Sequence, residues 1–180
     1  MIMRTEDDVI LVDSSDREVG VGKKSTVHRL GLLHRAFSVF LFDGQGRLLT
    51  QRRALDKYHS GGRWANSCCG HPRPGELTHP AAVRRVREEL GVSAILTEAG
   101  AFIYRAEVGA SLIEHEMDHV FVGKLRGEPA PDPREICSLA WVSIDELQAD
   151  LQQRPTRYAA WVAGALLVAL SVPTGALPSS

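Results

Sequence analysis

The stretch GHPRPGELTHPAAVRRVREELGV, residues 70–92, decides the fold, because a leader rich in glycine and proline runs directly into a helical pattern. Apolar side chains recur from Pro80 to Leu90 at the spacing of one face of an α-helix. Thr78 is expected to cap this helix, Pro80 suits its first turn, and Gly91 is expected to end it. The stretch therefore predicts a loop that leads into a central helix.

The charged side chains of this stretch have two interpretations. Arg85 and Glu89 are four residues apart on one helical face, so their spacing alone predicts only a surface ion pair. The complete pattern, Gly-x5-Glu-x7-Arg-Arg-Val-x-Glu-Glu-x-Gly-Val, resembles the Nudix box, a loop–helix motif that binds a divalent cation and a diphosphate. A glycine leader, a helix and a glycine stop in one register favour the second interpretation.

Arg85 is the position where the stretch departs from the Nudix box. Nudix hydrolases have a glutamate there, which belongs to their metal-binding and catalytic carboxylates. An arginine would repel the metal ions that water attack on a pyrophosphate needs. The resemblance to the box therefore implies the fold and a diphosphate site, and it weakens the interpretation as a hydrolase.

The flanking residues predict several strands and two further helices. Apolar and aromatic runs predict strands at residues 9–12, 36–42, 47–52, 101–106, 116–125 and 139–142. Ser143 and Glu146 fit a capping box that opens a helix through Leu151. Residues 155–170 predict a terminal helix, whereas residues 64–74 look irregular. This order suggests an α+β or α/β fold, and with the box we expect a Nudix-like α/β/α sandwich with a mixed sheet.

Length and composition indicate one ordinary globular domain. A chain of 180 residues favours a single domain, and 44% hydrophobic with 24% charged residues is typical of such domains. The formal net charge of −1 argues against a general nucleic-acid binder. Three cysteines provide no disulfide framework, so a reducing cytosol is the simplest setting.

Neither end of the chain indicates a membrane protein. Residues 1–10 lack the apolar core of a signal peptide. The longest apolar run, Ala159 to Leu170, has about twelve residues, which is too short to span a bilayer. We therefore expect a cytoplasmic protein that needs neither membrane nor nucleic acid, with a monomer as the default state.

A cysteine and a histidine open the box, in the segment NSCCGHP at residues 66–72. Such a pair is more often structural, because cysteine commonly behaves as a small buried apolar residue. Here Cys69 and His71 lie beside the expected phosphate site, and reactive groups gather at such sites. Their position favours a functional role.

Two carboxylates and two further histidines are candidates for metal binding. Glu114 and Glu116 share one face of an extended chain, where they repel each other unless a cation or a proton separates them. Alone they predict only an acidic edge, and His28 and His34 alone could be ordinary surface histidines. Together with His71 they form a set of nitrogen and oxygen donors that suits Zn²⁺, Mn²⁺ or Mg²⁺. The sequence leaves open whether the five converge.

These motifs together resemble the type 1 isopentenyl-diphosphate isomerases over about residues 28–161. The matching pieces are Arg52-Arg53-Ala54-Leu55, Trp64-x-Asn66-Ser67-x-Cys69-Gly70-His71-Pro72, Arg84-Arg85, Glu89-Leu90-Gly91, Tyr104-Arg105-Ala106 and Glu114-x-Glu116. Arg85, which departs from the hydrolases, matches this family. The family interconverts isopentenyl and dimethylallyl diphosphate in isoprenoid biosynthesis, so the resemblance implies that reaction and this small diphosphate as the partner.

The resemblance implies which residues handle protons. Cys69 and Glu116 exchange protons with the substrate from its opposite faces, and Tyr104 orients or assists Glu116. Protonating an unactivated alkene makes a tertiary carbocation, so the acid must be well placed and water kept out. Trp161 lies over the hydrocarbon, where an indole face stabilises a cation. An ordinary core tryptophan is the alternative for this last position.

The resemblance also implies how metals and phosphates are bound. One Mn²⁺, Zn²⁺ or Mg²⁺ is held by His28, His34, His71, Glu114 and Glu116, and Glu89 helps to bind a Mg²⁺ that arrives with the diphosphate. The phosphate oxygens are held by Lys24, Arg53 and Lys57. We expect one domain over residues 1–180, with a metal-binding extension at about residues 1–35 and a C-terminal helix at about residues 155–170.

Two other functions remain open on this fold. The first is a Nudix hydrolase of a nucleoside or prenyl diphosphate, and Arg85 argues against it. The second is a non-catalytic module that binds a diphosphate or nucleotide. The presence of both Cys69 and Glu116 argues against that module.

Overall fold

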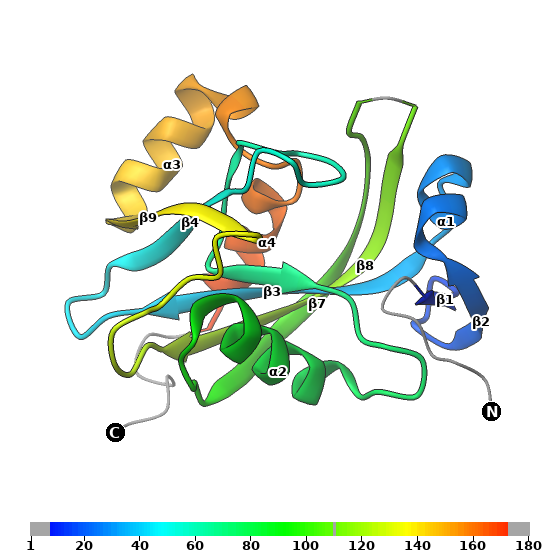
Figure 1. Ribbon diagram of the computed structural model, residues 1–180, viewed down its shortest axis with the longest axis horizontal. Coiled ribbons are helices and arrows are strands. Elements are labelled where there is room, and N and C mark those ends of the chain that lie inside the picture. Colours follow the sequence, from blue (N-terminus) through cyan, green and yellow to red (C-terminus); the bar gives the residue numbers. More distant parts are fainter. Residues whose placement is uncertain (1–7, 110, 173–180) are drawn as a thin grey trace.

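Nine strands of one mixed sheet form the framework of the computed structural model, which describes residues 8–109 and 111–172 (Figure 1). The strands are β1 (Asp8–Val12), β2 (Glu18–Lys23), β3 (His34–Phe42), β4 (Leu48–Arg53), β5 (Trp64–Ala65), β6 (Cys68–Gly70), β7 (Leu96–Glu107), β8 (Ile113–Lys124) and β9 (Ile136–Val142). The helices are α1 (Lys24–Leu30), α2 (Thr78–Leu90), α3 (Ile144–Gln153), the 3-10 turn η1 (Pro155–Arg157) and α4 (Val162–Ala169). Among these helices, none combines the length and apolar character needed to cross a membrane.

The central strand, β3, is buried on both faces. It pairs in parallel with β8 and antiparallel with β4 and β6, and β7 continues the sheet beyond β8. Because side chains alternate along a strand, Phe37 and Val39 pack under α2 whereas Phe40 and Phe42 pack under α4. Figure 1 shows these two helices on opposite faces of the sheet. The predicted α/β/α sandwich with a mixed sheet is confirmed.

Helix α2 has the predicted apolar face but a different beginning. Gly91 ends the helix as predicted, with a φ of 67° in the left-handed region that favours glycine. The prediction that Thr78 caps the helix is wrong. The Ala81 amide donates to the Leu77 carbonyl at 3.1 Å, so Leu77 is the N-cap and Thr78 already lies in the first turn.

Residues 64–74 are not simply irregular, because two short strands lie there. β5 pairs with β4, and β6 pairs with β3, with Cys69 opposite Ser38. Strands of two and three residues are too short for an alternating pattern to show in the sequence. Only the partner strands define them, which is why the local pattern missed them.

The C-terminal region confirms one prediction and corrects another. The capping box forms as predicted, since the Glu146 amide donates to Ser143 Oγ at 3.2 Å and the Ser143 amide donates to Glu146 Oε2 at 2.9 Å. The single helix predicted at residues 155–170 is wrong. η1 ends before Tyr158, which forms an isolated bridge with Trp64, and α4 starts only after this extended segment.

β3, β6 and β8 bring the candidate residues to one end of the sheet. β3 and β8 are parallel, so their N-terminal ends lie side by side with His34 opposite Glu116. β6 runs the other way, so its C-terminal end, followed by His71, meets them. α1, which no sequence pattern indicated, packs against β8 and carries His28.

Candidate active site

A pocket of about 340 Å³ opens at this end of the sheet. Most of the predicted site residues line it: Lys24, Arg53, Lys57, Cys69, His71, Glu89, Glu114, Glu116 and Trp161. The remaining ones, His28, His34 and Tyr104, are joined to this lining by short contacts. The fold therefore gathers the candidate residues around one cavity.

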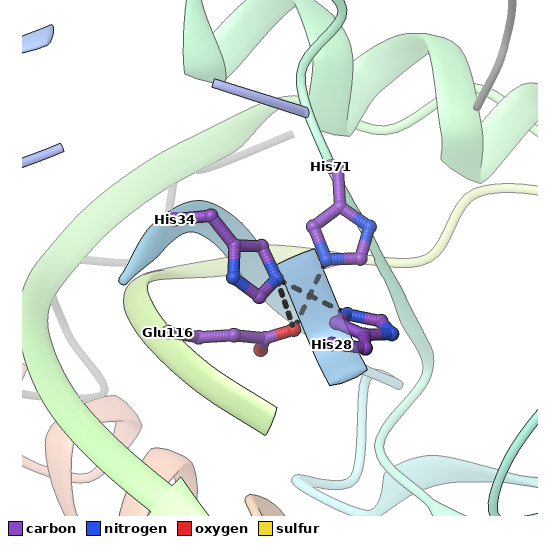
Figure 2. A group of neighbouring side chains, drawn as sticks. All are labelled: His28, His34, His71 and Glu116. Atoms are coloured by element: carbon purple, nitrogen blue, oxygen red, sulfur yellow. Dashed lines mark hydrogen bonds and ion pairs between the residues drawn. The ribbon is translucent and has the colours of Figure 1, made fainter. Parts of the chain in front are cut away.

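Three histidines and one glutamate form a compact group in this pocket, with their side chains pointing toward one another (Figure 2). The ligand atoms of His28, His34, His71 and Glu116 all lie within 4.8 Å of one another. The Nε2 atoms of His34 and His71 are 3.4 Å and 3.0 Å from Glu116 Oε1. The Nε2 atoms of His28 and His34 are 3.2 Å apart. The convergence that the sequence left open is confirmed for these four residues.

The donors of this group fit a divalent cation. His34 Nδ1 lies 2.9 Å from the Leu32 carbonyl; when it donates there, a neutral ring turns its Nε2 lone pair toward the group. Burial lowers the pKa of His28 to about 3 and that of His71 to about 4. Burial alone would raise the pKa of Glu116, but hydrogen bonds with His34 and His71 outweigh it and hold that pKa well below its usual range. Unprotonated nitrogen and oxygen donors are the form that binds a metal.

Glu114 lies outside this compact group of four, so its role as a fifth ligand stays a prediction. Its Oε2 is 3.1 Å from the Tyr104 hydroxyl, and its Oε1 is 3.1 Å from His59 Nδ1. Glu114 and Glu116 share a face of β8, but residues two apart on a strand are about 6–7 Å apart. Glu116 therefore reaches the three histidines, Glu114 reaches His59, and the Tyr104 hydroxyl contacts both carboxylates. Burial, and then the charge of Glu116, raises the pKa of Glu114 well above its usual range.

Cys69 lies on the pocket wall with its thiol protonated. Its Sγ is 3.5 Å from Arg53 Nη1. Burial raises the pKa of Cys69 to about 12, although the charge of Arg53 works against this shift. The neighbouring Cys68 is fully buried in the core under α2, because successive residues of β6 face opposite sides. Only one of the two adjacent cysteines is therefore available to a ligand.

Comparison with known proteins decides the family. A NUDIX domain model matches residues 32–162. The chain is 51% identical over 161 residues to "Isopentenyl-diphosphate Delta-isomerase 2" of Aromatoleum aromaticum, covering 89% of this chain and 85% of that protein. It is also 51% identical over 153 residues to the "Isopentenyl-diphosphate Delta-isomerase" of Serratia proteamaculans, covering 85% of this chain and 86% of that protein. The chain belongs to the isopentenyl-diphosphate Delta-isomerase family.

Solved structures similar to this member of the isomerase family agree on the fold. The DR0079 protein of Deinococcus radiodurans aligns with a TM-score of 0.71 at 22% identity, covering 92% of this chain and 99% of that one. A MutT protein of Methanosarcina mazei Go1 aligns with a TM-score of 0.61 at 18% identity, covering 77% and 92%. At such low identity these structures establish the NUDIX fold alone, and they support the predicted architecture.

The pocket of this isomerase family member is lined by many basic side chains. Its basic lining residues are Lys24, Arg53, Lys57, Arg73, Arg84, Arg85 and Arg134. Arg85 contacts Glu89 and lies 3.4 Å from Glu135, which also contacts Lys57. The basic lining residues outnumber the acidic ones, which suits a ligand that carries several negative charges.

Trp161 belongs to both the core and the pocket wall. It is 3% exposed, and its indole N–H donates to Asn66 Oδ1 at 2.9 Å. The guanidinium of Arg53 lies 5.3 Å from the centre of the ring, so this ring already faces a cation. The two interpretations of Trp161 from the sequence are therefore compatible.

Two buried pocket residues escaped the sequence motifs. Ser38 lies on β3, and its hydroxyl donates to Asp118 Oδ2 at 2.8 Å. His59 lies in the polar loop between β4 and β5, for which the sequence predicted only a connecting segment. The Ser60-Gly61-Gly62 sequence that follows His59 was the signal that could have indicated an unusual backbone there.

Proposed function

We propose that the protein interconverts isopentenyl diphosphate and dimethylallyl diphosphate in isoprenoid biosynthesis. The observation that carries this proposal is the presence of the Cys69 thiol and the Glu116 carboxylate in one cation-lined pocket. The reaction adds one proton at the terminal alkene carbon and removes another from the allylic methylene, so it needs two such groups. Relatives named for this isomerisation are 51% identical to the chain, which supports the same conclusion.

Cys69 and Glu116 are the proposed proton-exchanging groups, one on each face of the substrate. The Tyr104 hydroxyl lies 2.6 Å from Glu116 Oε2, where it orients this carboxylate. Burial of Glu116, which is 6% exposed, keeps water away from the carbocation that protonation produces.

The proposed resident metal is one divalent cation held by His28, His34, His71 and Glu116. Glu114 is the proposed fifth ligand, since its carboxylate shares the Tyr104 hydroxyl with Glu116 beside the group. A cation bound there fixes the position of the Glu116 carboxylate and shifts its acidity. Three imidazoles favour Mn²⁺ or Zn²⁺ over Mg²⁺.

The diphosphate is the proposed ligand of the basic side chains that line the pocket. Lys24, Arg53 and Lys57 are proposed to hold phosphate oxygens, and Glu89 to help bind a Mg²⁺ that arrives with the substrate. Binding here positions the hydrocarbon and contributes no bond-making step. Trp161 is the proposed wall beside the hydrocarbon, where its indole stabilises the developing cation.

Deuterium exchange tests the proposed reaction. Purified protein supplied with Mg²⁺ and Mn²⁺ in D₂O is expected to incorporate deuterium into isopentenyl diphosphate and to form dimethylallyl diphosphate, as measured by NMR. Incorporation at the background level with both metals present would contradict the isomerase. Release of inorganic phosphate instead would support the hydrolase alternative, against which Arg85 argues.

We also propose that the chain acts as one domain and as a cytoplasmic monomer. The described strands form one sheet, and the proposed groups either line one pocket or contact its lining. Analytical ultracentrifugation is expected to give a single species near 19.7 kDa. A species of twice that mass at working concentrations would contradict the monomer.

A further inference from the structure

His59 is a buried pocket residue to which the proposed reaction gives no role. It is 8% exposed and lines the pocket. Its ring lies edge-on to Trp161 and to His28, with centroid distances of 6.4 Å and 5.3 Å. Its backbone carbonyl accepts a hydrogen bond from Arg53 Nη2 at 3.3 Å. His59 therefore touches the metal group, the proposed hydrocarbon wall and a proposed phosphate ligand.

The nearest acceptor for the His59 ring is Glu114. Nδ1 of His59 lies 3.1 Å from Glu114 Oε1. The same nitrogen is fully buried and makes no aligned hydrogen bond within the described residues. A buried polar atom without a partner is unfavourable. Because the two groups are already within hydrogen-bond distance, a small rotation of either one aligns them.

The backbone that follows His59 is shaped to keep its ring in the pocket. Ser60 has a φ of 53°, which is uncommon for a residue with a side chain. A Cβ on Gly61 would lie 2.4 Å from the Leu55 carbonyl oxygen, so only glycine fits there. Gly62 has a φ of 74°. Such backbone constraints persist where the surrounding structure maintains them, and they cluster at functional sites.

We infer that His59 is a positioning residue of the metal site, whose Nδ1–H donates to Glu114 Oε1 and holds that carboxylate in place. The Tyr104 hydroxyl lies 3.1 Å from Glu114 and 2.6 Å from Glu116, so the restraint on Glu114 reaches the metal group. If Glu114 also binds the cation, His59 orients a ligand directly. The inference rests on the proposed function only through the assignment of the metal site.

Metal affinity of the apoprotein tests this role without any turnover. Protein stripped with a chelator is titrated with Mn²⁺ by calorimetry. His59→Ala is expected to bind Mn²⁺ about 10–100-fold more weakly, the usual effect of losing a group that orients a metal ligand. His59→Asn presents an amide N–H near the position of Nδ1 and is expected to restore most of the affinity. His59→Gln presents its N–H near the position of Nε2, so it is not expected to restore the affinity for Mn²⁺.

A second histidine of the chain provides the matched control. His79 lies on α2 outside the pocket and is exposed, with Nε2 3.0 Å from the Leu96 carbonyl. His79→Ala is expected to bind Mn²⁺ as tightly as the wild type. Thermal unfolding of each apo variant shows whether it folds. If His59→Ala fails to fold, the difference between His59→Asn and His59→Gln carries the test.

A double-mutant cycle tests whether His59 acts on Mn²⁺ affinity through Glu114. In a Glu114→Ala background, His59→Ala is expected to cause no further loss of Mn²⁺ affinity, because the acceptor of its N–H is already absent. An equal loss in both backgrounds, or a His59→Ala variant that binds like the wild type, overturns the inference. A wild-type protein that binds no Mn²⁺ overturns the metal assignment itself, which is a distinguishable failure of the proposed function.

Discussion

Two groups of carboxylates lie at or beside the pocket, one on α2 and one at the end of β8, and the protein neutralises them differently. On α2, Glu88 contacts Arg84 and Arg85 at 3.0 Å each, and Glu89 contacts Arg85. At the end of β8, Glu116 faces imidazoles instead, including that of His71, whose pKa is lowered to about 4 by burial. The carboxylates on α2 are thus neutralised by arginines, whereas Glu116 faces imidazoles that carry no charge of their own.

This difference indicates which region gathers a metal by itself. A carboxylate paired with arginine already has its counter-charge, so a cation gains little there unless a polyanion engages the arginine. A carboxylate among neutral imidazoles is left for a divalent cation to neutralise. We therefore expect the box carboxylates to need a ligand that brings its metal, and the histidine group to bind a metal in its own right.

The largest expected effect on turnover comes from removing Cys69 or Glu116, the two proposed proton-exchanging groups. Cys69→Ala and Glu116→Gln are each expected to lower isomerase turnover by about 10²–10⁴-fold, because each removes a proton-exchanging group. The rate is measured by NMR with saturating isopentenyl diphosphate and metal. Cys68→Ala is the control, since that side chain lies in the core and is expected to change stability without a comparable loss of rate. Near wild-type turnover in either active-site variant would contradict its role.

The next effect concerns pH and the metal-free histidine group. The His71 pKa falls from 6.5 to about 4 on folding, so the unfolded chain binds more protons within that window. Stability is therefore present above pH 6.5 and lost as the pH falls toward 4, by about 1–3 kcal/mol. Urea unfolding of chelator-treated protein at pH 7.5 and pH 4.5 measures the loss. His71→Gln is expected to make this dependence less steep, with the buried His28 still contributing to it, and an equally steep profile in that variant would contradict the assignment.

A smaller effect is expected from the arginine that neutralises the box. Arg85→Gln is expected to raise the KM for isopentenyl diphosphate about tenfold, equivalent to about 1.4 kcal/mol, because the pocket loses a cation and Glu89 loses its partner. Steady-state kinetics measure the change. Arg87→Gln on the same helix is the control, since Arg87 contacts Ser93 and is not part of the pocket lining. An unchanged KM would show that Arg85 does not serve the diphosphate.

The smallest effect is expected at the exposed carboxylate of the box. Glu88 is 38% exposed at its side chain and already paired with two arginines, so Glu88→Gln is expected to change turnover by less than about twofold. The same NMR assay measures it at several Mg²⁺ concentrations. A large loss that extra Mg²⁺ repairs would mean that the box binds metal as it does in a hydrolase, and the contrast between the two regions would fail.

Much of the fold was predictable because its signals are local. The spacing over residues 80–90, the stop at Gly91 and the capping box at Ser143 each depend on neighbours within one or two helical turns. The missed elements depend on distant partners. β5 and β6 exist only through pairing with β4 and β3, and the break before α4 follows the bridge between Tyr158 and Trp64.

The candidate site divides in the same way. Residue chemistry and the family resemblance point to Cys69, His71 and Glu116, and all three line one pocket. His59 could not be found this way, because its contact with Glu114 joins the loop after β4 to a strand much later in the chain.

The sequence by itself determined the box helix, and it predicted the types of residue proposed to handle protons and metal and the arginine expected to separate isomerases from hydrolases. These follow from spacing along one helix and from side-chain chemistry, which need no distant partner. Only the tertiary structure decided that Glu116 joins the three histidines while Glu114 stays beside Tyr104 and His59. The physical reason is that both carboxylates share one face of β8, and only the neighbouring strands and loops determine what each one meets.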